Sequence, residues 1–133
     1  MKVIGFVCEH GGAAAFTLAG ERRFPLPSEV TLIALPCLGR LGAVHILRAF
    51  REGAAAVFVA GCLEGNCHHL YGNLEAGKRV EQARRILAQV GMDGRRLEIF
   101  HLSSDQAWKA REMAEEMVRR ARELGPSPLE ARA

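Results

Sequence analysis

Apolar and polar residues follow two different periods along this chain. Short, nearly all-apolar runs rich in Val, Ile and Phe predict strands, and longer segments with an apolar residue at every third or fourth position predict helices. The predicted strands cover residues 2–7, 30–35, 55–60 and 96–100. The predicted helices cover residues 13–19, 41–52 and 74–90, with a last one from a cap at Ser103 or Ser104 to about residue 124. Strands that alternate with helices in this order indicate a parallel sheet.

The same pattern predicts which side chains are buried. The run at 30–35 is almost continuously apolar, which is typical of a strand covered on both faces. Each long helix has one apolar stripe and ends at a glycine, namely Gly53, Gly91 or Gly125. The three stripes contain Leu41, Val44, Leu47 and Phe50 in the first helix, Val80, Ala83, Ile86, Leu87 and Val90 in the second, and Trp108, Met113, Met117, Val118 and Leu124 in the third.

The size and composition of the chain suit a single domain. The 133 residues are 49% hydrophobic, enough for a core of their own, and neither a repeat nor a linker interrupts the pattern. We therefore expect a flavodoxin-like, three-layer α/β fold, with an open, mostly parallel, four-stranded sheet and helices on both faces. The domain would span residues 1–125, and residues 126–133 would form a loose C-terminal tail.

The charge pattern excludes some classes of function. The formal net charge of +3 is too small to indicate nucleic-acid binding. Arginine pairs at 84–85, 95–96 and 119–120 fit solvated helix faces, or a docking surface for an acidic partner protein. No apolar run approaches the ~18 residues of a membrane span, and the N-terminal run is too short for a signal peptide. We therefore expect a cytoplasmic protein, where cysteines indicate metal or redox chemistry more than disulfides.

All four cysteines follow predicted strands. Cys8 comes after the first strand, Cys37 after the second, and Cys62 and Cys67 after the third. Ligands of open parallel sheets bind outside the carboxyl ends of the strands, and neighbouring strands lie ~5 Å apart. If these three strands are neighbours, the four thiols can share one site. The pattern therefore predicts a metal site made by Cys8, Cys37, Cys62 and Cys67.

Several chemistries remain open for such a site. Four thiolates suit an iron–sulfur cluster or tetrahedral zinc, and one C-x4-C pair with two distant single cysteines fits a cluster better than a zinc knuckle. A thiol enzyme that pairs one cysteine with His10, His68 or His69 is the other alternative. One of the adjacent histidines could instead line the metal site and tune its potential. His45 and His101 are interpreted as structural.

The stretch at 61–73, GCLEGNCHHLYGN, carries a family resemblance. It is similar to the G-C-x-x-G-x-C-H-[YF]-x-x-G-N signature of the delta subunit of methyl-viologen-reducing hydrogenase. The segment LPCLGR at 35–40 resembles that family's M-C-[ST]-G-R element, and AFREGA at 49–54 resembles its A-F-x-x-G-A-D element. The order and spacing hold from about residue 3 to residue 124. Arg40, at the end of the second element, would place a charge near the cluster or contact a partner.

The resemblance implies a small electron carrier with a [2Fe–2S] cluster. In that family, the subunit connects a hydrogenase or dehydrogenase module with the flavin-bearing subunit of a heterodisulfide reductase-like complex. Catalysis would belong to the complex and not to this chain alone. The matching ligand positions are Cys37, Cys62 and Cys67, with Cys8 at the start of the family's N-terminal C-x-x-C.

Two positions depart from the family pattern. The second cysteine of the N-terminal C-x-x-C is Gly11 here, and His69 stands where the family often has an aromatic residue. Four cysteines still remain, enough for one cluster. The fourth ligand is therefore expected to be Cys8, with His10 as the alternative.

Overall fold

Within the part of the chain that the structure describes, four parallel strands form one open sheet in the order β2-β1-β3-β4. The computed structural model describes residues 2–8, 26–35, 40–61, 72–101 and 106–126, with the side chains of residues 72–74 left out. The predicted helix at 13–19 lies outside these residues, as does all of the predicted tail at 126–133 except Pro126. The strands are β1 (Val3–Cys8), β2 (Val30–Leu35), β3 (Ala56–Gly61) and β4 (Leu97–His101).

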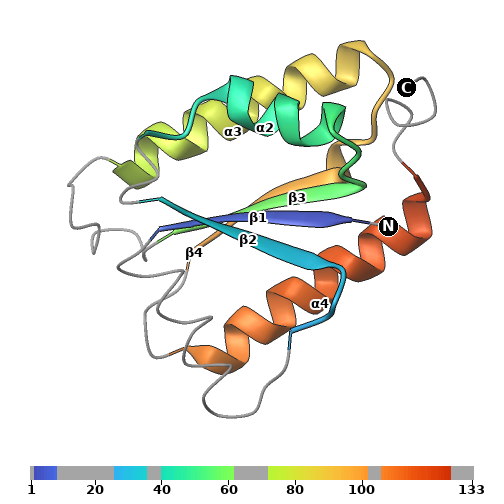
Figure 1. The fold of residues 1–133 in the computed structure, drawn as a ribbon. Helices are drawn as coiled ribbons and strands as arrows, with labels where there is room; N and C mark the ends of the chain where they lie inside the picture. The colour runs from blue at the N-terminus through green and yellow to red at the C-terminus, as the bar shows by residue number, and fades with distance from the viewer. Residues whose placement is uncertain (1, 9–25, 36–39, 62–71, 102–105, 127–133) are drawn as a thin grey trace.

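Helices cover both faces of the sheet, as predicted. Figure 1 shows α2 and α3 on one face and α4 on the other. Their bounds are Ala43–Arg51 for α2, Gly72–Gln89 for α3 and Ala107–Leu124 for α4, and a short 3-10 turn, η2, covers Gly94–Arg96 before β4. No helix in the described ranges combines the length and apolar character needed to cross a membrane. The flavodoxin-like α/β fold class expected from the sequence is therefore confirmed.

The two central strands, β1 and β3, are buried along their whole length. Successive side chains of these strands point to opposite faces of the sheet, so that alternate residues pack under α2 and α3 and the residues between them pack under α4. Gly5 of β1 lies against the ring of Phe58 on β3, so closely that a Cβ atom at Gly5 would overlap the ring. This glycine is therefore required by close packing between the two strands.

β2 does not have the two-sided burial predicted for it. It is one of the two outer strands of the sheet that the described residues form, and its residues are exposed or half-buried. Ile33 is 41% exposed. A continuous apolar run cannot distinguish an edge strand from a central one, because strand order depends on contacts that are distant in sequence.

The helices bury narrower stripes than predicted. Ile46, Ala49 and Phe50 form the buried face of α2, and Val44 is exposed. Ile86 and Val90 of the second predicted stripe are also exposed, as is Trp108 of the third. A rotation of 100° per residue separates Trp108 from Ala107 and Ala110, which do face the sheet. The N-cap of α4 is Gln106, so neither Ser103 nor Ser104 occupies the predicted cap position.

One arginine is buried where the sequence indicated a solvated pair. Arg96 is 4% exposed and reaches the amino edge of the sheet. Its Nη1 donates to the carbonyl of Ala55 at 2.9 Å, just before β3, and to the carbonyl of Gly125 at 2.8 Å. Its Nη2 donates to the carbonyl of Leu124 at 2.9 Å. Arg96 therefore joins the C-terminal end of α4 to the sheet, and burial lowers the pKa of its guanidinium.

Candidate metal centre at the carboxyl edge of the sheet

Three neighbouring strands end together at one edge of the sheet. Cys8, the last residue of β1, is in register with Leu35, the last residue of β2. On the other side, Val7 is in register with Ala60, one residue before the end of β3. With neighbouring strands ~4.8 Å apart, the ends of β2 and β3 lie roughly 10 Å from one another, with the end of β1 between them. The neighbourhood of strands assumed in the sequence argument is confirmed.

Cys8 is the one predicted ligand within the described residues. The sequence suggested that Cys8 follows the first strand. It is instead the last residue of β1, because pairing with β2 continues to this residue. Its side chain is buried, in the apolar cluster between the sheet and the helices α2 and α3. The other three predicted ligands, Cys37, Cys62 and Cys67, lie outside the described residues, as do Gly11 and the histidines at 10, 68 and 69.

The strand ends therefore lie side by side, but only one of the four predicted ligands lies among the described residues. Among the residues that the structure describes, no group of three or more His, Cys, Asp or Glu side chains could hold a metal ion. Since those residues contain a single member of the predicted set, the assignment of Cys8, Cys37, Cys62 and Cys67 stays a prediction.

Two side-chain contacts fix the helices that begin at this edge. Arg79 of α3 donates from Nη1 to the carbonyl oxygen of Leu41, just before α2, at 3.1 Å. His45 accepts a hydrogen bond from the backbone N–H of Gly42 at 2.9 Å through Nδ1, which satisfies a donor at the start of α2. His45 thus has the structural role expected of it. Together the contacts order the start of α2 and connect it to the middle of α3.

The described part of the carboxyl edge also carries positive charge. The three α-helices within the described residues all begin there, and the backbone N–H groups of a helix N-terminus carry partial positive charge. Lys109, in the first turn of α4, donates from Nζ to the carbonyl oxygen of His101 at the end of β4, at 3.0 Å. The sequence did not single out Lys109, because its position depends on how α4 packs on the sheet. Such an edge favours negatively charged groups, thiolates among them.

Comparison with known proteins identifies relatives along nearly the full chain. A family model described as methyl-viologen-reducing hydrogenase, delta subunit, matches residues 3–125. A protein of Methanopyrus kandleri, named as the vhu iron-sulfur subunit of F420-non-reducing hydrogenase, is 43% identical over 124 residues, which cover 93% of this chain and 94% of that protein. A protein of Methanococcus maripaludis with the same name is 41% identical over 129 residues, which cover 97% of this chain and 96% of that protein.

A further relative is a much longer protein. It is named as a subunit of the ferredoxin:CoB-CoM heterodisulfide reductase of Methanosarcina mazei, and it is 31% identical over 124 residues. The match covers 93% of this chain but only 16% of that longer protein. A region similar to this chain is therefore one part of a longer polypeptide in that organism.

Proposed function

Because the chain belongs to the methyl-viologen-reducing hydrogenase delta-subunit family, we propose that it is the iron–sulfur electron-transfer subunit of a hydrogenase–heterodisulfide reductase type of complex. In this proposal, Cys8, Cys37, Cys62 and Cys67 hold one [2Fe–2S] cluster. When bound, such a cluster accepts and releases single electrons. The chain relays them between a hydrogenase or dehydrogenase module and a flavin-bearing subunit, and the catalytic reactions belong to those partners.

The observation that carries the ligand assignment is the meeting of three strand ends at one edge. Cys8 ends the middle strand of the three. Cys62 directly follows the last residue of β3, and Cys37 is the second residue after β2. Since consecutive Cα atoms are ~3.8 Å apart, covalent connectivity keeps these two Cα atoms within roughly 4 and 8 Å of the strand ends beside Cys8.

The described part of this edge suits a thiolate-bound cluster. Cys8 is buried among apolar side chains, so the chain itself would keep water from one ligand sulfur. The three helix N-termini and Lys109 supply positive charge where four thiolates would gather. Burial and nearby charge are the means by which a protein sets the potential of such a group.

The names of the relatives support the proposed partners. Two of them are named iron-sulfur subunits of a hydrogenase, which supports a hydrogenase as one partner. The longer relative is named as part of a heterodisulfide reductase, which supports a protein of that kind as the other partner. Covalent attachment keeps two domains close, so a fused copy of this domain suggests that the separate chain acts beside the same protein. We place the complex in the cytoplasm, a reducing compartment that suits four metal-bound cysteines.

Replacement of single ligands tests the proposal. We expect anaerobically purified protein to contain about two irons and two acid-labile sulfides per chain and to show an electron paramagnetic resonance signal after reduction by dithionite. Cys8→Ser and Cys67→Ser should each lose more than half of the iron and sulfide. Ala34→Ser is the matched control, because it adds a hydroxyl at an exposed residue of β2 and removes no thiol.

Other results would change the assignment in specific ways. Zinc without sulfide in the wild-type protein would replace the electron carrier by a zinc-stabilised binding module. A metal-free protein with one fast-reacting thiol would favour a cysteine–histidine enzyme. Full iron in Cys8→Ser, together with its loss in His10→Ala, would make His10 the fourth ligand.

A further inference from the structure

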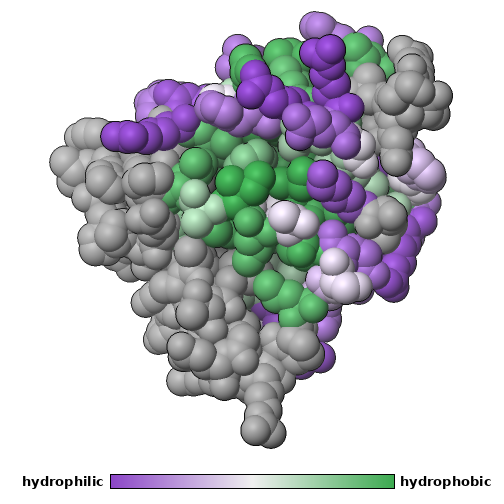
Figure 2. Space-filling model, in the orientation of Figure 1, coloured by the Kyte–Doolittle hydropathy of each residue, from purple (hydrophilic) through white to green (hydrophobic). Residues whose placement is uncertain are grey.

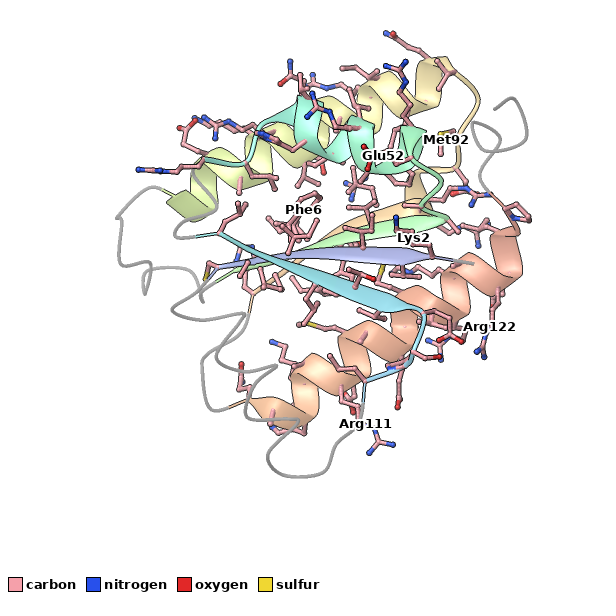
Figure 3. All side chains as sticks on the ribbon, viewed as in Figure 1. Lys2, Phe6, Glu52, Met92, Arg111 and Arg122 are labelled. Carbon is pink, nitrogen blue, oxygen red and sulfur yellow. The ribbon has the colours of Figure 1, made fainter. Side chains whose placement is uncertain are left out.

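An apolar groove opens between β2 and α2. It has a volume of about 430 Å³, and its floor is made by Ile4 and Phe6 of β1 and by Ile33 and Leu35 of β2. Figure 3 shows Phe6 extending from β1 toward the helices on that side. On the face shown in Figure 2, hydrophobic residues gather below the hydrophilic residues of the upper helices. We call this surface the β2–α2 groove.

The groove exists because no helix covers β2 on this side in the described part of the chain. α2 packs against α3 and β3, and so lies over the centre of the sheet. The outer strand is left half-covered, with Ile33 41% exposed. β2 is also an edge strand of the sheet that the described residues form, and none of these residues pairs with the outer side of its backbone.

The rim of the groove carries arginines without carboxylate partners. Arg40 and Arg48 both line it, and neither forms an ion pair within the described residues, although Glu52 lines the same groove. Arg51 and Arg85 likewise form no ion pair within the described residues, whereas six arginines on or near α3 and α4 each contact a carboxylate. These are Arg84, Arg95, Arg111, Arg119, Arg120 and Arg122. Uncompensated positive charge therefore lies beside exposed apolar surface.

The groove also lies next to the proposed cluster. Leu35 and Arg40, which both line it, flank residues 36–39 in the sequence, and Cys37 is one of these. A protein bound in the groove would lie within a few residues of a proposed ligand. Because electron transfer slows steeply with distance, a partner that exchanges electrons with the cluster needs such proximity.

We propose that the β2–α2 groove binds an extended segment of the flavin-bearing partner protein, which pairs with the edge of β2. The segment would place apolar side chains on Ile33 and Leu35, and carboxylates against Arg40 and Arg48. Strand addition of this kind takes affinity from main-chain hydrogen bonds and specificity from the side chains that enter the groove. This proposal rests on the proposed function, since that function names the partner.

Binding measurements with two matched pairs of variants test the proposal. The probe is the flavin-bearing heterodisulfide reductase-type protein of the same organism, titrated with the full chain carrying its cluster. Ile33→Glu changes the groove, and Ile86→Glu makes the same change at a similarly exposed residue of α3, 37% against 41%. Arg48→Glu reverses a rim charge, and Arg85→Glu makes the same reversal on α3.

We expect Ile33→Glu and Arg48→Glu each to raise the Kd at least about tenfold, equivalent to ~1.4 kcal/mol, and both controls to stay within about twofold of wild type. Unchanged circular dichroism would show that each variant folds. If both groove variants bound the partner as tightly as wild type, the groove would not be the docking site, and the proposed function would remain intact. No binding by cluster-loaded wild type would overturn the proposed partner and the groove together. A wild-type dimer that Ile33→Glu dissociates would assign the groove to a second copy of this chain and overturn the proposal.

Discussion

Replacing Arg96 with methionine tests whether one buried guanidinium holds the C-terminal helix to the sheet. The side chain donates to three carbonyl oxygens at 2.8–2.9 Å, one before β3 and two at the end of α4. Methionine fills much of the same space but donates no hydrogen bond. The change therefore removes the donors while keeping most of the packing.

The expected loss follows from the contacts. A hydrogen bond from a charged donor contributes ~1.5–3 kcal/mol to stability, and a buried carbonyl left unpaired costs ~1–3 kcal/mol. Water can replace the donor at the partly buried helix end, so the two contacts there count near the lower limit. Arg96 also places positive charge at the negative end of α4. We expect Arg96→Met to lower the free energy of unfolding by about 3–5 kcal/mol.

Urea unfolding of the whole chain, followed by circular dichroism, measures this loss. With a urea m-value of ~2 kcal/mol/M, the midpoint should fall by about 1.5–2.5 M. Arg95→Met is the control, because Arg95 contacts Asp93 at the surface, where solvent and salt screening leave an ion pair with little effect on stability. Arg96→Lys should fall between the two, since an ammonium keeps the charge but lacks the planar fork that reaches several carbonyls. Equal midpoints for Arg96→Met and Arg95→Met would refute the role assigned to Arg96.

Substitutions at two glycines should change stability in opposite directions, and one surface ion pair should make stability depend on pH. Gly5→Ala should destabilise the protein by ~1–3 kcal/mol, because the new methyl group overlaps the Phe58 ring. Gly77 in α3 has open space around it, so Gly77→Ala should stabilise the protein by up to ~1 kcal/mol. Thermal melts in which both variants shift the melting temperature in the same direction would contradict this. The hydrogen bond from the Arg95 side chain holds the pKa of Asp93 below its usual 3.8, so the pair stabilises the fold above that pH and ceases to do so as the pH falls through the lowered value. Urea midpoints of wild type and Asp93→Asn should therefore show a small difference at about pH 7, as expected for a surface ion pair, and converge near pH 2. A difference that is constant with pH would exclude the ion pair as its cause.

The sequence predicts the elements of this fold well because strands and helices have different periods. The apolar runs before Cys37 and Cys62 end at or within one residue of the strand ends in the structure. The order of the strands is a different kind of information. An apolar run such as VTLIAL satisfies a central strand and an edge strand equally, so the exposure of Ile33 could not be predicted from it.

Single side chains that act across the fold were also beyond prediction. Arg96 belongs to a pair of adjacent arginines that looks solvated in sequence, yet Arg95 is exposed and Arg96 is buried. The difference arises because the start of β3 and the C-terminal end of α4 meet beside Arg96, and these two segments are distant in the chain. For the candidate site, the spacing of cysteines predicted a shared edge, and the parallel register of β1 with β2 and β3 supports that edge for Cys8.

The two ends of the domain lie far from the proposed cluster. The carbonyl of Lys2 accepts a hydrogen bond from Ala55 at 2.8 Å, and the end of α4 meets Arg96, so both ends gather at the amino edge of the sheet (Figure 1). A linker attached before β1 or after α4 would leave the opposite edge clear. The domain can therefore be inserted into a longer polypeptide without a change at the edge where the cluster is proposed. Such covalent attachment would raise the effective concentration of the domain beside a partner. The stretch of similar sequence within the longer Methanosarcina mazei protein is the kind of architecture that this geometry permits.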